Sequence, residues 1–92
     1  MKEFVTKVGS PVGLHARPAA LFAQSSKNSG CKVSLAKIKD DGTESPFVDG
    51  ASILKIMSLG IKCGESVRVQ IEGDNETDTA SALQAIVESS DH

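Results

Sequence analysis

The sequence predicts an α+β fold in which three helices cover one face of a four-stranded antiparallel sheet. Two observations support this: some segments alternate apolar and polar residues as strands do, and others repeat apolar residues every three or four positions as helices do. The segments follow one another as βαββαβα along 92 residues. They bury their apolar faces most simply as two layers, and we expect a single domain over residues 1–92.

The first strand is predicted over residues 2–8, where apolar and polar side chains alternate. Phe4, Thr6 and Val8 are expected on one face of this strand, and Val5 and Lys7 on the other. Residues 9–13 contain two glycines and a proline, which interrupt regular structure, and they predict a loop.

The first helix is predicted from about Arg17 to Asn28. Its inner face should carry Ala19, Phe22, Ala23 and Ser26. Gly30 should end the helix, because glycine readily adopts the left-handed conformation found just past a last turn.

The next segment predicts a β-hairpin. Residues 31–38 alternate again, Asp40-Asp41-Gly42 is a turn signal, and residues 44–49 predict a short return strand. Pro46 cannot donate a hydrogen bond to a neighbouring strand, so this strand belongs at a sheet edge.

Residues 50–59 predict a brief helix, and Gly60 and Gly64 bracket the turn after it. Strict alternation at residues 67–72 predicts a half-buried strand. Asp74 or Asn75 can cap the last helix. The apolar positions of this helix are Ala80, Leu83, Ile86 and Val87.

Composition excludes several classes of function. The net charge is −2 and the pI is about 5.6, whereas nucleic-acid binders usually show a basic face. The apolar runs are too short to span a membrane, and the acidic residue at position 3 argues against a signal peptide. Cys31 and Cys63 lack metal-ligand spacing, so we expect free thiols and no disulfide.

The segment Gly13–Ala20 holds the candidate site, with His15 between a glycine-bearing loop and a helix start. Backbone N–H groups at a helix start have no helical acceptor, and they bind anions. The amides of Ala16 and Arg17 are the expected phosphate ligands, together with the Arg17 guanidinium. A neutral imidazole nitrogen is a nucleophile, so His15 is the candidate for covalent phosphoryl transfer.

Two questions remain open from the residues alone. Pro18 disfavours helical angles at Arg17, so the helix could begin at Arg17 or at Pro18, and this start decides which N–H groups face the anion. A lone histidine beside an arginine at a helix start is more often a cap or a surface residue than a phosphorylation site.

Residues 13–19, Gly-Leu-His-Ala-Arg-Pro-Ala, resemble the active-site signature of HPr, the histidine-containing phosphocarrier family of the bacterial sugar phosphotransferase system. Residues 52–61 resemble the second helix of that family and the turn after it. The resemblance implies an open-faced β-sandwich. It also implies that enzyme I, charged from phosphoenolpyruvate, phosphorylates His15 on Nδ1, that Arg17 neutralises the phosphate, and that IIA domains of sugar permeases receive it.

The resemblance further implies a partner-docking patch around the first two helices. By position this patch comprises Ala16, Ala20, Leu21, Ile53, Leu54 and Ile56. We expect Ile53 and Leu54 to be exposed, and Ile56 and Met57 to lie in the core.

Ser52 matches a serine that a dedicated kinase phosphorylates in many family members. A serine before an apolar helical run is also a common N-cap, and Lys55 stands where kinase-regulated members often have glycine. Such regulation would add an HPr serine kinase and a transcriptional regulator to the partners.

The chain departs from the family in its hairpin. The connection over residues 37–46 is longer than the usual tight turn and carries Asp40, Asp41 and Glu44. We expect it to alter a sheet edge and to leave the chemistry of His15 unchanged.

Three functions compete. The first is a cytoplasmic, monomeric sugar-system phosphocarrier with no cofactor and no metal. The second is a regulatory binding module acting through Ser52, against which the presence of His15 and Arg17 argues. The third is a carrier for a nitrogen-type branch. Turnover as an enzyme is not expected, because no acid/base pair, metal set or cofactor loop accompanies His15.

Overall fold

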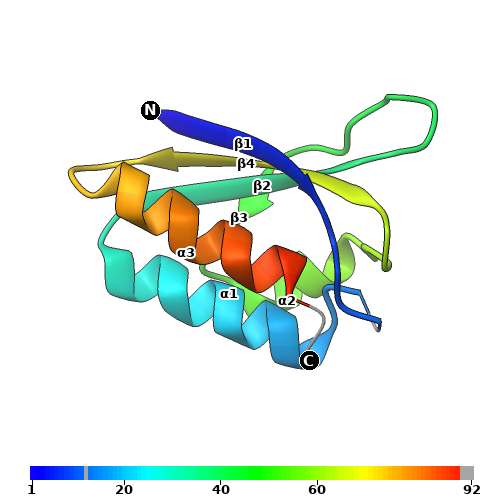
Figure 1. Ribbon diagram of the computed structural model, residues 1–92, viewed down its shortest axis with the longest axis horizontal. Helices are drawn as coiled ribbons and strands as arrows, with labels where there is room; N and C mark the ends of the chain where they lie inside the picture. Colours follow the sequence, from blue (N-terminus) through cyan, green and yellow to red (C-terminus); the bar gives the residue numbers. More distant parts are fainter. Residues whose placement is uncertain (12, 90–92) are drawn as a thin grey trace.

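The computed structural model describes residues 1–11 and 13–89, and it shows one antiparallel sheet with three helices packed on one face (Figure 1). The elements are β1 (Lys2–Lys7), α1 (Ala16–Ser29), β2 (Lys32–Ile38), β3 (Val48–Asp49), α2 (Ile53–Ser58), β4 (Ser66–Glu72) and α3 (Glu76–Glu88). The predicted α+β class and the βαββαβα order are confirmed.

The strands lie in the order β1-β4-β2-β3, so the two long strands β4 and β2 form the middle of the sheet. Val69 at the centre of β4 pairs with Phe4 of β1 on one side and with Leu35 of β2 on the other. Because side chains alternate across a strand, this register places one apolar row under the helices.

The core lies between the sheet and the helices. Each predicted inner residue of α1 is buried, and so are Ala80, Leu83 and Val87 of α3, while Ile86 packs at the margin. The largest fully buried side chains are Phe22, Leu35, Ile56, Ile71 and Leu83. Burying apolar groups of this size contributes roughly 1.5–3 kcal/mol each, so this apolar layer holds the helices in place.

The return strand of the hairpin is shorter than predicted. Of residues 44–49, only Val48–Asp49 form β3, and Glu44 makes an isolated bridge to Ile38. Pro46 lies between these two pairings and has no N–H to donate. The prediction of a continuous strand was therefore wrong.

The long hairpin extends past one end of the sheet (Figure 1) and is tied to the face that the helices leave open. Glu44 Oε1 lies 2.8 Å from Arg68 Nε of β4, and the same guanidinium contacts Glu3 of β1. Ala36, which pairs with Arg68 in the register, is fully buried on this open face. One arginine thus connects the hairpin, the central strand and the edge strand.

The second helix is shorter than the predicted range of residues 50–59, because α2 begins only at Ile53, after Ser52 in an extended conformation at the N-cap. The remaining boundaries follow the sequence closely. Gly30 ends α1 in the left-handed conformation, with φ of 72°. Asn75 precedes α3 as predicted, but its side chain makes no capping bond; Glu76 Oε2 accepts the N–H of Gly73 at 3.1 Å instead. In the predicted loop over residues 9–13, Val12 lies outside the described residues. Within residues 1–11 and 13–89, no helix is long and apolar enough to span a bilayer.

Candidate functional site

The start of α1 places His15 at the N-cap position, immediately before Ala16. The carbonyl of His15 accepts the N–H of Ala19 at 2.8 Å, which is the first hydrogen bond of the helix. The imidazole makes no capping bond. The helix therefore begins at Ala16, one residue earlier than the sequence indicated, and it leaves the His15 ring available.

Packing explains why Arg17 is helical although a proline follows it. Leu14 on one side of the turn and Ala19 on the other are buried, with exposed fractions of 2% and 0%. The burial of Leu14 and Ala19 fixes the backbone between them in the first turn of the helix. This burial outweighs the preference for extended backbone angles that Pro18 imposes on Arg17.

Two backbone donors are available beside His15. Within the described part of the chain, the N–H groups of Ala16 and Arg17 have no acceptor, as expected for the first turn of a helix. Pro18 has no N–H. The helix contributes the positive end of its dipole to the same point, so an anion bound here would meet two donors and a favourable potential.

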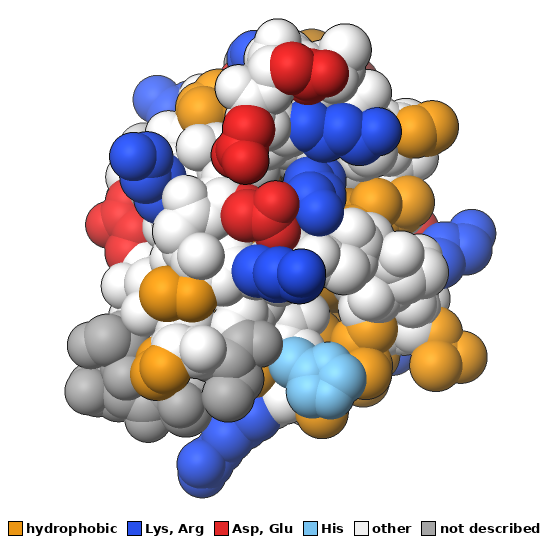
Figure 2. Space-filling view, turned by 90° about the vertical axis from the view of Figure 1, so that its right-hand side faces the viewer, with side chains coloured by type: hydrophobic (Ala, Val, Ile, Leu, Met, Phe, Trp, Pro, Cys, Tyr) orange, Lys and Arg blue, Asp and Glu red, His pale blue; other side chains and the backbone are white. Residues whose placement is uncertain are grey.

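The side chains of His15, Ala16 and Arg17 are all exposed. In the described residues, the Arg17 guanidinium belongs to none of the four ion pairs. Figure 2 shows the histidine ring (pale blue) at the surface, with hydrophobic side chains beside it and charged side chains above it. The three consecutive residues that the sequence singled out for phosphate are thus all accessible to solvent.

The loop before His15 is held by a segment distant in sequence. The N–H of Leu14 donates to the carbonyl of Ile61 at 3.0 Å. Gly13 has φ of 74°, and a Cβ at this position would lie 2.3 Å from the same carbonyl oxygen. Only glycine satisfies both the backbone conformation and the close approach.

The contact with Ile61 was not predicted. The glycines at positions 60 and 64 indicated a turn, but nothing in the pattern indicated that this turn supports the loop of His15. The signal available in the sequence was the repeated glycine at positions 13, 60 and 64, each of which has a positive φ.

The residues of the expected docking patch lie on α1 and α2. Ala16 is exposed and Ala20 is half-buried, and the exposed fractions of the larger side chains are 42% for Leu21, 40% for Ile53 and 80% for Leu54. Hydrophobic side chains at the right of Figure 2 mark an apolar surface beside the histidine. Exposed apolar groups gathered in this way are typical of a docking surface.

Ile56 is fully buried and Met57 is partly buried against the core. The expectation that these two side chains of α2 belong to the core is confirmed. The apolar surface is therefore formed by Ile53 and Leu54 on α2, together with the exposed residues of α1.

Ser52 caps α2. Its half-buried hydroxyl accepts the N–H of Lys55 at 3.4 Å, a long hydrogen bond. The cap role that the sequence indicated is confirmed, and Ser52 directly precedes the two exposed apolar residues of the patch.

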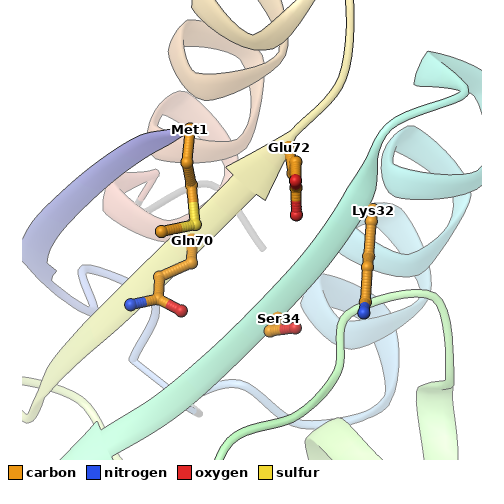
Figure 3. Close-up of a pocket in the computed structure, with 5 residues that line it drawn as sticks. All are labelled: Met1, Lys32, Ser34, Gln70 and Glu72. Atoms are coloured by element: carbon orange, nitrogen blue, oxygen red, sulfur yellow. The ribbon is translucent and has the colours of Figure 1, made fainter.

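Two surface hollows lie apart from His15. One, of about 120 Å³, lies on the open face of the sheet and is lined by Met1, Lys32, Ser34, Gln70 and Glu72 (Figure 3). The other lies between α1 and α3 and is lined mainly by hydroxyl and amide side chains. Neither has His15 or Arg17 in its lining. In the described residues, no group of three His, Cys, Asp or Glu side chains could hold a metal ion.

Comparisons with known proteins find related sequences and structures. The family profile described as "PTS HPr component phosphorylation site" matches residues 2–89. The phosphocarrier protein HPr of Mycoplasma genitalium is 34% identical over 88 residues, which cover 96% of this chain and 94% of that protein. The HPr-like protein Crh of Halalkalibacterium halodurans is 35% identical over 88 residues, covering 96% and 98%.

A solved structure shows the same fold. The crystal structure of HPr from Thermoanaerobacter tengcongensis superposes with a TM-score of 0.79 at 36% identity, and the match covers 96% of this chain and 92% of that one. The open-faced β-sandwich that the sequence implied is confirmed.

Proposed function

The chain belongs to the HPr family of phosphocarrier proteins of the phosphotransferase system, and we propose that His15 carries its phosphoryl group. The observation that supports this assignment most strongly is the free, exposed imidazole at the N-cap of a 14-residue helix. The available amides of Ala16 and Arg17 lie next to it along the chain.

The proposed step needs only positioning and charge stabilisation. A ring nitrogen of His15, which we assign as Nδ1, attacks phosphorus and forms the N–P bond. The bond from phosphorus to the donor breaks, its electron pair leaves with the donor group, and the other ring nitrogen keeps its proton. The transferred dianion is then held by the Ala16 and Arg17 amides and by the Arg17 guanidinium.

The partners in this proposal are enzyme I as donor and IIA domains of sugar permeases as acceptors. Each would dock on the apolar surface of α1 and α2, where Leu54 is 80% exposed. Transient interfaces commonly combine such an apolar centre with a polar rim. The chain would act as a stoichiometric, monomeric carrier in the cytoplasm, with no turnover of its own.

Regulation at Ser52 is a second candidate function. Its hydroxyl lies at the start of α2, directly before Ile53 and Leu54. A phosphate there would add a charge of about −1.5 to −2 at the docking surface and would oppose a partner with an acidic surface. The similarity to Crh of Bacillus subtilis, which is described as a catabolite repression HPr, supports such a role. A serine kinase and a transcriptional regulator would then be further partners.

The central test is phosphorylation with enzyme I, Mg²⁺ and phosphoenolpyruvate. We expect one acid-labile phosphate on the wild-type chain and none on His15→Ala. His92→Ala is the matched control, because the chain has two histidines, and this variant should be labelled like wild type. Circular dichroism should show that His15→Ala is folded. An acid-stable phosphate, or label retained by His15→Ala, would contradict the proposal.

A further inference from the structure

The turn over residues 60–65, between α2 and β4, forms the support beneath the His15 loop. The Ile61 carbonyl holds the N–H of Leu14 at 3.0 Å. At the other end of the turn, Gly64 donates to the carbonyl of Val8 at 2.8 Å, and Val8 donates to the carbonyl of Glu65 at 2.9 Å. The segment that carries His15 is thus held by this turn at both ends.

The carboxylate of Glu65 binds both the backbone of this turn and the side chain of Lys37. One oxygen, Oε1, accepts the N–H of Lys62 at 2.7 Å, and the other, Oε2, lies 3.3 Å from the ammonium nitrogen of Lys37. The backbone of Glu65 adds a third bond, from its N–H to the Lys62 carbonyl, at 3.0 Å. The side chain of Glu65 is 22% exposed and that of Lys37 is 20% exposed, so both are half-buried.

Lys37 holds the opposite end of the same turn. Its ammonium nitrogen also donates to the carbonyl of Gly60 at 3.3 Å. Lys37 lies on β2, at the base of the long hairpin. One ion pair therefore joins the first residue of the turn, its last residue and a central strand of the sheet.

We propose that Glu65 is a positioning residue for phosphoryl transfer at His15, acting with Lys37 to hold the turn whose Ile61 carbonyl fixes Leu14. This inference rests on the proposed function of His15. Leu14 directly precedes His15, so a displaced turn would change the direction of the imidazole relative to the Ala16 and Arg17 amides. Small displacements of this kind are costly in transfer reactions.

The ionisation of Glu65 agrees with this role. The Lys62 N–H lowers the pKa of the Glu65 carboxyl, and the Lys37 ammonium lowers it further. Glu65 is therefore charged at neutral pH and can keep both contacts.

The experiment measures kcat and KM of enzyme I with the carrier as the varied substrate. In Glu65→Ala we expect kcat to fall by about tenfold while KM stays within about twofold, because the nucleophile is misplaced and the docking surface is intact. Glu65→Gln can still accept the Lys62 N–H, so it should restore kcat to within about threefold of wild type. Asp74→Asn, which changes an exposed carboxyl at the far end of β4, is the control and should leave both constants unchanged.

A second measurement reads the geometry directly. Hydrogen exchange of the Leu14 amide should become faster in Glu65→Ala and should stay slow in Asp74→Asn. If Glu65→Ala does not fold, Lys37→Met removes the ammonium while keeping an aliphatic side chain, and it should lower kcat by about threefold.

The outcomes separate this inference from the proposed function. Absence of label on wild-type His15 would overturn both. Normal labelling of wild type, with Glu65→Ala showing an unchanged kcat or an unchanged Leu14 exchange rate, would overturn the role of Glu65 alone. A rise in KM without a fall in kcat would also count against positioning and would indicate a docking role.

Discussion

The backbone N–H of Leu14 donates to the carbonyl of Ile61 at 3.0 Å, and this hydrogen bond joins the loop before α1 to the turn after α2. The next residue after Leu14 is the proposed phosphorylation site. The position of the nucleophile thus depends on a segment that lies outside the proposed phosphate site and far from it in sequence.

Gly13→Ala tests the close approach that permits this hydrogen bond. We expect the free energy of unfolding to fall by about 3 kcal/mol, because alanine is strained at positive φ and its Cβ would overlap the Ile61 carbonyl. Gly42→Ala is the control, since Gly42 also has a positive φ but has open space around it, and it should lose only about 1 kcal/mol. Urea unfolding measures both. Equal losses in the two variants would show that the Ile61 contact contributes nothing.

Arg17→Ala tests the phosphate ligand. The rate of phosphoryl transfer from enzyme I should fall by about 10- to 100-fold, because a hydrogen bond to a charged group contributes about 1.5–3 kcal/mol. Arg17→Lys should fall less, since lysine keeps the charge but not the planar donor pair. Stability should be unchanged, because Arg17 is exposed. A wild-type transfer rate in Arg17→Ala would remove this residue from the site.

Leu54→Ala tests the docking surface. KM for enzyme I should rise by about fivefold, because about 1 kcal/mol of apolar contact is lost, and the melting temperature should not fall, since the side chain is 80% exposed. Val5→Ala is the matched control, because Val5 is an exposed apolar residue of β1. If both variants raise KM equally, the proposed patch is not specific.

Two substitutions test Ser52, one for its role as a helix cap and the other for regulation by phosphate. Ser52→Ala removes the cap and should lower stability by about 0.5 kcal/mol, the low end for caps, because the bond to Lys55 is long at 3.4 Å. Ser52→Asp keeps a capping oxygen and adds a charge, so it should fold normally and slow transfer from enzyme I. The stability of both variants is measured by urea unfolding. An unimpaired rate of transfer from enzyme I to Ser52→Asp would argue against regulation by phosphate at this position.

The ion pairs on the open face predict a pH effect. Hydrogen bonding to the Arg68 guanidinium lowers the pKa of the Glu3 carboxyl below its usual value. A carboxyl with a lowered folded-state pKa stabilises the protein above the unfolded-state pKa, and this contribution is lost as pH falls through the folded-state pKa. In a carbon-13 NMR titration, Arg68→Gln should raise the pKa of Glu3. If the titration midpoint of Glu3 is the same in Arg68→Gln as in wild type, Arg68 does not bind the Glu3 carboxylate in solution.

The sequence predicted the fold because its periodicities are local. Val67, Val69 and Ile71 alternate strictly, and each is fully buried on β4. The return strand was predicted too long because Pro46 was expected to occupy an edge, whereas its missing N–H interrupts the pairing between Glu44 and Val48.

At the site, the sequence identified residues but not their support. The chemistry of His15 and Arg17 and their place at a helix start made them candidates, and the resemblance of residues 13–19 to the HPr signature singled them out. The exact start of α1 depended on the burial of Leu14 and Ala19, which is a tertiary effect. The roles of Ile61 and Glu65 depend on contacts between distant segments, and no local pattern reports such contacts.

The pairing of β1 with β4 bears on how the protein is made. Synthesis proceeds from the N-terminus, so the first strand emerges long before its hydrogen-bonding neighbour, and Leu14 emerges long before Ile61. Non-local pairing of this kind is completed late in folding. A nascent fragment that lacks the fourth strand would therefore have an unanchored imidazole, and it could compete with folded carriers for the donor only after residues 61–72 have emerged.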